Sequence, residues 1–239
     1  SYQDKWTLLV VPLHGRGNKD AEGAGVKIQR YVPPTAENAE WTIQIIDETL
    51  HKTHNFDPVQ WDDDVAQEFL IGAKEGWFVA NWSREKSGYI LESLGSAEAG
   101  GAGEIRLGKG LRDNRFVATV EPMHGNALVL YTPPANSTAG TRWNRRVLDD
   151  TLVDGHALAC GDLLGIGRDQ IVVGWRAMNR PGVKVGIKVF TPLDAEGKEW
   201  RNGDVADGQL LLRAGNKLHV HSLKNGNRIQ EIALEANQV

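Results

Sequence analysis

Hydrophobic and polar residues alternate along most of this chain, in short runs that turn residues separate. In residues 41–47, WTIQIID, apolar side chains occupy alternate positions over the first five residues, as in a strand with one buried face. Residues 68–73, EFLIGA, and 170–175, QIVVGW, are short and largely apolar, which is typical of strands buried on both faces. No segment sustains the i, i+3, i+4, i+7 spacing of an amphipathic helix. The pattern therefore predicts an all-β protein made of short strands.

The sequence also contains an internal repeat. Segments 40–54 and 142–156 share a Trp, an alternating strand, an Asp, and a His seven residues after that Asp. Between them, GYILESL (88–94) takes the place of the Trp-led strand and GAGEIRLG (101–108) that of the His-led segment. The repeating unit has about 50 residues and four expected strands. Four-stranded antiparallel units that cannot bury both faces alone are typical of β-propeller blades, so we predict a β-propeller.

Four such units are expected, and the first lacks its innermost strand. The expected strands cover residues 6–13, 25–32 and 41–47; 55–61, 68–73, 76–82 and 88–94; 103–108, 115–122, 126–132 and 143–149; and 156–163, 170–175, 185–191 and a strand near Trp200. Residues 209–234 hold three more strands, turned at Gly215-Asn216 and Asn225-Gly226, that do not continue this pattern. We therefore divide the chain into propeller blades in 1–208 and an atypical short β element in 209–239, either a closing blade or part of a further blade.

Unpaired strand edges are avoided in natural sheets, and an incomplete first unit would leave one. We therefore expect missing sequence near Gly208 or before Ser1, an additional domain or partner chain, or an atypical closing blade. Charge is balanced, with 27 Lys and Arg against 31 Asp and Glu, interspersed along the chain. This argues against a nucleic-acid partner or an anionic membrane surface, and no apolar run is long enough for a membrane span.

Two further features narrow the chemistry. Cys160 is the single cysteine, which excludes an internal disulfide and a thiolate zinc cluster, and its apolar neighbours predict a buried packing role. The glycine-rich segment 14–25 joins two strands and opens no helix, so we expect no nucleotide cofactor. We interpret it as a surface insertion, with a lid over a cavity as the alternative.

Aligning the units places several histidines in equivalent positions. His54 and His156 stand where the innermost strand of a unit begins, and Gly103 with Glu104 holds this place in the third copy. A second set of positions follows the next strand: His14, Glu75, His124 and Arg176. In a propeller both sets lie at the same end, around the mouth of the channel. We therefore expect these side chains, with Asp57 and Glu121, to converge on one cavity.

Segments 53–77 and 156–176 resemble FG-GAP or VCBS repeats of bacterial seven-bladed propellers, and also the propeller portion of aldos-2-ulose dehydratases, a family of carbohydrate lyases. The resemblance covers residues 6–207. It implies a ring that is seven-bladed when complete, a periplasmic or secreted location, and a carbohydrate or other small polar substrate.

The calcium turn of many such repeats, DxDGDGxxD, is altered in this chain. In residues 162–169, Leu164 and Ile166 stand where carboxylates are needed, so we expect no calcium there. The acidic run at 62–64 with Glu68 is interpreted as a solvated turn, with a replacement calcium site as the alternative.

Two hypotheses follow. The first is a metal-assisted carbohydrate lyase or dehydratase that acts by β-elimination on a keto-sugar or uronate-type substrate. Neutral imidazole suits a divalent transition metal of the zinc or manganese type, so the expected metal ligands are His54, His124 and His156. The expected catalytic residues are His14, Glu75 and Arg176. The expected substrate-binding residues are Trp61, Trp77, Trp175 and Glu121. The second hypothesis is a non-catalytic propeller whose rim binds a protein or glycan.

Overall fold

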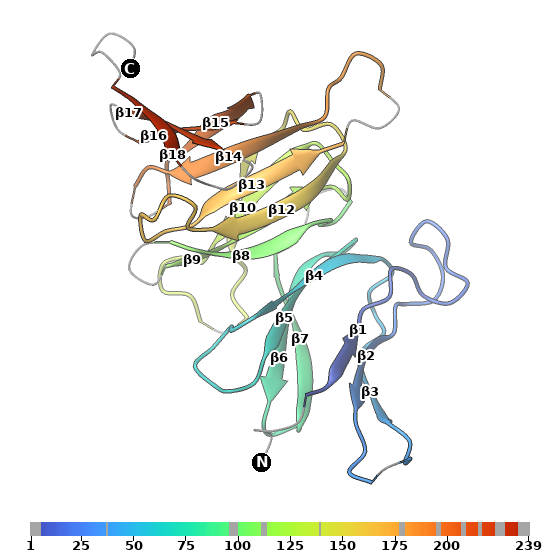
Figure 1. The fold of residues 1–239 in the computed structure, drawn as a ribbon. Helices are drawn as coiled ribbons and strands as arrows, with labels where there is room; N and C mark the ends of the chain where they lie inside the picture. The colour runs from blue at the N-terminus through green and yellow to red at the C-terminus, as the bar shows by residue number, and fades with distance from the viewer. Residues whose placement is uncertain are drawn as a thin grey trace.

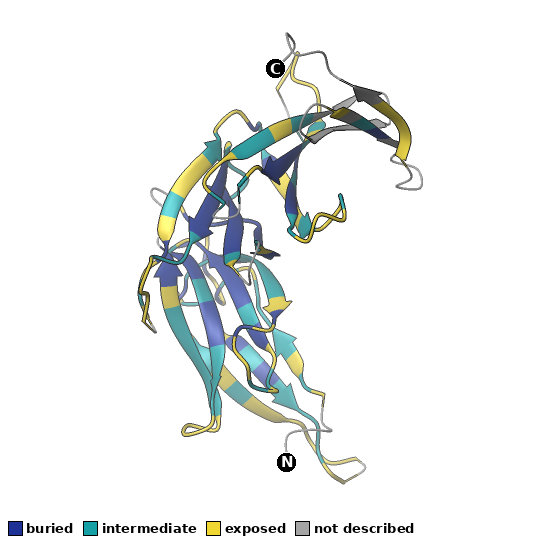
Figure 2. Ribbon diagram, turned by 90° about the vertical axis from the view of Figure 1, so that its left-hand side faces the viewer, coloured by how far each residue is buried: buried dark blue, intermediate teal, exposed yellow. Residues whose placement is uncertain are grey.

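The computed structural model describes residues 6–36, 38–95, 100–110, 114–138, 140–176, 180–194, 197–206, 209–214, 217–222 and 228–233. Every regular element in this part of the chain is a β-strand, which confirms the all-β prediction. Each strand pairs antiparallel with the next one inside its sheet. The sheets follow one another along an open arc (Figure 1; Figure 2). No closed ring is detected among the described residues, so the propeller and its number of blades stay predictions.

The strands form four sheets. The first contains β1 (Leu8–Val10), β2 (Ile28–Val32) and β3 (Thr42–Asp47). The second contains β4 (Thr53–Val59), β5 (Glu68–Ala73), β6 (Gly76–Ser83) and β7 (Gly88–Gly95). The third contains β8 (Ile105–Lys109), β9 (Arg115–Glu121), β10 (Ala127–Thr132) and β11 (Asn144–Asp149). The predicted strand positions and the three-stranded first unit are therefore confirmed.

The fourth sheet is longer than a single predicted unit. It contains β12 (Gly155–Gly161), β13 (Gln170–Trp175), β14 (Gly186–Pro192), β15 (Trp200–Ala206), β16 (Gln209–Ala214), β17 (Lys217–Ser222) and β18 (Arg228–Ala233). The three strands expected in the C-terminal element thus continue the fourth unit through the pairing of β15 with β16. The predicted turns at 215–216 and 225–226 lie outside the described residues, and the domain division at residue 208 stays a prediction.

The core lies between successive sheets, and the central strands contribute to it from both faces. On β5, Leu70 faces the third sheet and packs with Ile105, whereas Ile71 faces the first sheet and packs with Ile28. All four side chains are fully buried. Because neighbouring side chains of a strand point to opposite faces, a strand between two sheets must be apolar at consecutive positions. This explains the continuous apolar run of β5.

Successive sheets approach closely at the end where β4, β8 and β12 begin. Backbone hydrogen bonds join them there: Thr53 N donates to Leu13 O at 3.1 Å, Ala102 N to Ala73 O at 2.9 Å, and Gly155 N to Gly125 O at 2.9 Å. Gly72 makes this approach possible, because a Cβ at this position would lie 2.9 Å from Ala102 O. The starts of three sheets are therefore held together as one rigid rim.

Two further expectations concern Cys160 and membrane-spanning segments. Cys160 packs against the core between the third and fourth sheets, and burial raises the pKa of its thiol. The thiol therefore stays protonated at neutral pH, as expected of a packing residue. Within the described residues there is no helix with the length and apolarity that a membrane crossing needs.

Candidate functional site

Three histidines from different sheets meet at this rim. His54 is the second residue of β4, His156 is the second residue of β12, and His124 lies in the turn between β9 and β10. Strand β8 lies between β4 and β12, which brings the starts of these strands together (Figure 1). One ring nitrogen from each histidine lies within 4.8 Å of the other two. The structure thus gathers the three residues that repeat equivalence singled out.

The three rings pack edge to face, and two of them have lowered pKa values. The ring centroid of His124 lies 4.5 Å from that of His54 and 4.5 Å from that of His156. Nε2 of His124 lies 2.7 Å from Nε2 of His54, so one nitrogen must donate and the other accept. Burial, followed by the neighbouring imidazoles, lowers the pKa of His124 to about 4. Burial also lowers the pKa of His54. Both rings are therefore neutral at pH 7, the form that binds metal ions.

Glu104 lies behind this histidine centre, as we call His54, His124 and His156. Its Oε1 is 3.6 Å from Nδ1 of His54 and 3.4 Å from Nδ1 of His156, and its side chain is 6% exposed. Asn55 Nδ2 donates to the second oxygen, Oε2, at 2.5 Å. A carboxylate that accepts a hydrogen bond from Nδ1 orients an imidazole and leaves its other nitrogen for a ligand. Glu104 faces Nδ1 of both rings, but the 3.6 Å to His54 must shorten for such a bond to form. Glu104 stands in the third copy at the position of His54 and His156, yet the sequence did not assign it a role.

The donor set fits a transition metal. Three imidazole nitrogens with a buried carboxylate behind them are typical of sites that bind zinc and leave a position for substrate. Nitrogens bound to one tetrahedral metal at 2.0–2.1 Å are about 3.3 Å apart. The 2.7 Å between His54 and His124 is shorter than this, so the rings must separate slightly to hold a metal. Nδ1 of His54 is buried and makes no hydrogen bond within the described residues.

A groove borders the histidine centre on the fourth sheet. Its volume is about 530 Å³, and its walls include His156, Trp175, Arg176 and Ile187. Arg176 is held by Asp154, with Nε 2.8 Å from Oδ2. The indole Nε1 of Trp175 donates to Lys184 O at 2.8 Å, which fixes its ring. A guanidinium and an aromatic ring therefore stand beside one of the three histidines.

Glu75 and His14 lie at the same end of the first two sheets but outside the histidine centre. Oε1 of Glu75 accepts hydrogen bonds from the backbone N of His51 at 3.1 Å and from its Nδ1 at 2.8 Å. Oε2 of Glu75 and Nδ1 of His14 are buried and make no hydrogen bond within the described part of the chain. His14 forms a β-bridge with Lys52. The pairing of His51 with Glu75 was not expected, because His51 falls outside both aligned positions.

The other expected substrate-binding residues lie in the core. Trp77 is fully buried and packs against Trp143 and Tyr131 with centroids 5.5 Å away. Trp61 is 8% exposed and stacks on Trp143 at 5.4 Å. Neither ring presents a face to a cavity at the histidine centre.

Glu121 is also buried, at 1% exposed. Its Oε2 accepts two hydrogen bonds from Arg145, and its Oε1 accepts hydrogen bonds from Tyr131 and Thr119. These bonds hold the carboxylate inside the third sheet. The structure therefore does not bring Glu121 to the histidine centre.

The 14–25 segment lies against the neighbouring sheet. Asn18 Nδ2 donates to His51 O and to Ala24 O, both at 2.9 Å, and Lys74 Nζ donates to Ala21 O at 3.3 Å. Ala21 is buried. The segment is thus fastened to the second sheet, and whether it covers a bound substrate stays a prediction.

A second group of potential metal ligands lies on the turn between β4 and β5. Asp62, Asp64 and Glu68 each have a carboxylate oxygen within 4.8 Å of the others. Asp62 and Asp64 accept backbone hydrogen bonds within the turn, as expected of an acidic turn. Glu68 departs from the expectation of a solvated turn, because it is fully buried and accepts a hydrogen bond from Trp61 N at 2.9 Å. In the 162–169 turn, Asp162 accepts the backbone N–H groups of Ile166 and Gly167.

Comparison with known proteins gives one distant similarity. The chain is 30% identical over 147 residues to aldos-2-ulose dehydratase from Phanerodontia chrysosporium. The alignment covers 53% of this chain and 16% of the dehydratase, so the chain spans only a small part of that protein. No protein family model matches the sequence. The FG-GAP or VCBS repeats therefore stay a prediction, and the result is a sheet-rich chain distantly similar to a dehydratase.

Proposed function

We propose that this chain is a metal-assisted carbohydrate lyase or dehydratase that acts by β-elimination on a keto-sugar or uronate-type substrate. The observation that carries the proposal is the meeting of three imidazoles, from three sheets, with Glu104 buried behind them. The distant relative supports the substrate class, since its name describes the dehydration of an aldos-2-ulose. The bordering groove supplies room for a sugar beside His156.

His54, His124 and His156 would hold a divalent metal of the zinc or manganese type. Such a metal supplies Lewis-acid polarisation of a carbonyl or carboxylate oxygen, which acidifies the adjacent C–H bond. Glu104 keeps Nδ1 of His54 and His156 directed away from the ligand position. The lowered pKa values of His54 and His124 keep both rings neutral at neutral pH, so each ring has one unprotonated nitrogen to offer a metal.

Glu75 is the proposed general base, and His51 is its positioning residue. Oε1 is occupied by His51, and the buried Oε2 must become accessible when substrate binds in order to accept the proton from the carbon next to the substrate carbonyl. The electron pair of that C–H bond then forms the C=C bond as the hydroxyl leaves from the β-carbon. The proton that Glu75 removed passes to the hydroxyl, which departs as water, and general acid–base help of this kind contributes about 10²- to 10⁴-fold. His14 is the alternative base.

Substrate contact is assigned to Trp175 and Arg176. The fixed indole ring of Trp175 offers an apolar surface to the C–H face of a sugar, and the guanidinium of Arg176 offers donors to a carboxylate or hydroxyl. Trp61, Trp77 and Glu121 are assigned no contact with substrate, because they are buried away from the histidine centre.

The first experiment is metal analysis of protein purified without added metal. We expect nearly stoichiometric transition metal in the wild type and in His219→Ala, a control histidine on β17. The double variant His54→Ala, His156→Ala should contain none. Metal-loaded wild type incubated with keto-sugars or uronate oligomers should then form a conjugated double bond, seen by ultraviolet absorbance. Absence of metal from the wild type would reject the lyase and favour a non-catalytic binding protein.

A further inference from the structure

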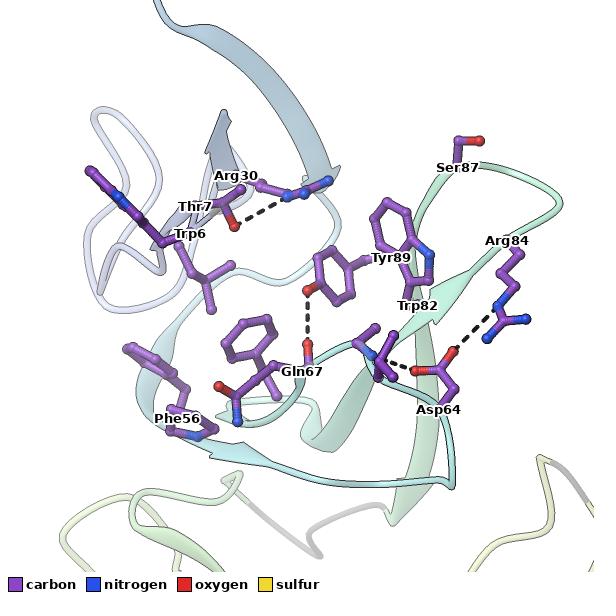
Figure 3. Close-up of a pocket in the computed structure, with 15 residues that line it drawn as sticks. Trp6, Thr7, Arg30, Phe56, Asp64, Gln67, Trp82, Arg84, Ser87 and Tyr89 are labelled. Atoms are coloured by element: carbon purple, nitrogen blue, oxygen red, sulfur yellow. Dashed lines mark hydrogen bonds and ion pairs between the residues drawn. The ribbon is translucent and has the colours of Figure 1, made fainter. Parts of the chain in front are cut away.

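A second concave feature lies between the first and second sheets. It is a cleft of about 900 Å³, bordered by β1 and β2 on one side and by β4 to β7 on the other (Figure 3). It is larger than the groove beside His156 and within the size range of small-molecule sites. No residue of the histidine centre lines it. We call it the aromatic cleft.

The aromatic cleft and the histidine centre lie toward opposite ends of the second sheet. His54 is near the start of β4, whereas Pro58, which lines the cleft, is near its end. Phe56, which also lines the cleft, is two residues beyond His54 and Pro58 is four, about 7 Å and 13 Å along the strand at 3.3 Å per residue. Trp82 and Tyr89, which pair across β6 and β7, also lie at the cleft end. The cleft is therefore a separate site.

Aromatic rings form one wall of the cleft and hold one another in place. The centroids of Trp82 and Tyr89 are 5.1 Å apart, and those of Phe69 and Tyr89 are 5.4 Å apart. The guanidinium of Arg30, a residue only 5% exposed, lies 4.9 Å from the Trp82 ring centroid. Arg30 Nε donates to Thr7 Oγ1 at 3.3 Å (Figure 3). These rings are fixed before any ligand arrives, which lowers the entropic cost of binding.

The rim of the cleft is polar but its charges are paired. Asp64 and Arg84 face each other at 3.8 Å across the rim (Figure 3). Tyr89 Oη donates to the backbone oxygen of Gln67 at 2.8 Å, and the exposed residues Gln67 and Ser87 also line the cleft. Hydrogen-bond donors and acceptors therefore surround an apolar wall; Asp64 and Arg84 face each other, and the third charged residue of the lining, Arg30, lies against the Trp82 ring. This combination suits an uncharged ligand with many hydroxyl groups.

Trp6 adds an exposed ring at the first-sheet side of the cleft. It is 72% exposed, and its ring centroid lies 5.5 Å from that of Trp41. Large exposed aromatic surface is costly in water and commonly marks a binding site. A sugar ring has an apolar C–H face for such an indole and a hydroxyl edge for polar groups like those of the rim.

We propose that the aromatic cleft binds a neutral oligosaccharide. Its sugar rings lie against Trp6 and the Trp82–Tyr89 pair, and its hydroxyls contact the Gln67, Asp64 and Arg84 side of the rim. The inference rests on the proposed function only for the choice of carbohydrate as the ligand class. It needs neither the metal nor the histidine centre.

Isothermal titration of the metal-free chain with cellotetraose and with maltotetraose tests the proposal. We expect one of the two to bind, and Trp6→Ala to weaken that binding about tenfold, equivalent to about 1.4 kcal/mol. Gln67→Ala should weaken it less. Trp175→Ala, which removes an indole from the other groove, and the double variant His54→Ala, His156→Ala should leave the affinity unchanged. Circular dichroism confirms that each variant is folded.

Three results would overturn the proposal. Failure of both sugars to bind folded wild type would do so, and so would an affinity unchanged in both Trp6→Ala and Gln67→Ala. Binding of the apolar dye anilinonaphthalene sulfonate at the cleft without binding of either sugar would assign it to an apolar partner. Sugar binding is measured without metal, so a failure of the lyase proposal does not change the expected binding in the cleft. A failure of the cleft to bind sugar likewise does not affect the metal analysis.

Discussion

The two ends of the second sheet differ in how closely the neighbouring sheets approach. At the histidine end, backbone hydrogen bonds join the second sheet to the first and to the third. At the other end, the first and second sheets border a cleft of about 900 Å³. One set of strands, β4 to β7, takes part in both. The same sheet thus builds a closely packed polar centre and an open aromatic surface.

The difference follows from which side chains face the neighbouring sheet. At the histidine end, Gly72 brings β5 close to the backbone of Ala102, and the small Ala73 accepts a hydrogen bond from it. At the cleft end, Phe69 of the same strand and Tyr89 of β7 present large rings that the short strand β1 does not cover. Small residues therefore close the second sheet onto the third, whereas large rings line the cleft between the second sheet and the first.

The largest effect is expected from two indoles on β6. Trp77 is fully buried between the second and third sheets, whereas Trp82 lines the cleft. Trp77→Ala should lower the free energy of unfolding by about 3–5 kcal/mol, because it removes a ring from a packed core. Trp82→Ala should cost clearly less. Urea denaturation compares the two, with Trp77→Phe as a milder control. Equal losses would mean that the cleft wall is part of the core.

Removal of the carboxylate behind the histidines should weaken metal binding without removing a ligand. Glu104→Ala is expected to lower the metal affinity about 10- to 100-fold, the range for a residue that orients ligating histidines. Glu104→Gln should lower the metal affinity less than Glu104→Ala does. Glu75→Gln is the matched control, because Glu75 bonds His51 rather than the histidine centre. Competition with a metal chelator measures these affinities. If Glu104→Ala binds metal like the wild type, Glu104 has no orienting role.

The strands and the three histidines could be predicted because their signals are local or repeated. Period-two alternation depends on neighbouring residues only, and the strands appeared where it placed them. Equivalent positions in successive units fold alike, so His54 and His156 came together. Glu104 occupies the equivalent position in the third unit, but this carboxylate was not interpreted from the sequence as a partner of the two histidines.

The failures concern contacts that depend on which face of a strand a residue takes. Trp77 and Glu121 were expected to bind substrate at the propeller mouth, but a shift of one residue reverses the face of a strand, and both side chains are buried in the core. The pairing of His51 with Glu75, 24 residues along the chain, was missed because His51 lies outside the aligned positions. The aromatic cleft depends on how far two sheets diverge, which no local pattern describes.

A smaller effect is expected where a methyl group is added between two sheets. In Gly72→Ala the new Cβ would lie 2.9 Å from Ala102 O and must displace the segment that leads to Glu104. We expect a loss of stability of about 1–3 kcal/mol, as for other overpacked positions, and severalfold weaker metal binding. Gly88→Ala, on β7 at the cleft end, is the control, since its nearest contact would be an ordinary 3.7 Å. If both substitutions leave metal affinity unchanged, close approach does not position the centre.

The smallest effect is a dependence of stability on pH, which has opposite signs for Glu68 and for the histidines. Burial, with the negative charges of Asp62 and Asp64, raises the pKa of Glu68, although the N–H of Trp61 opposes the shift. The folded state then holds this proton more tightly than the unfolded chain. The stability that Glu68 contributes is therefore present below pH 4.5 and is lost as the pH rises through the raised pKa. At the histidine end, the lowered pKa values of His54 and His124 give the opposite dependence.

Glu68→Gln removes this charge while keeping an oxygen for the N–H of Trp61. We expect the variant to unfold at a higher urea concentration than the wild type at pH 7, and to match it near pH 4, where Glu68 of the wild type is protonated. Asp63→Asn, an exposed neighbour on the same turn, should change little at either pH. If Glu68→Gln were equally destabilising at both values, the carboxylate would have to act through its shape and hydrogen bonds rather than through a buried charge.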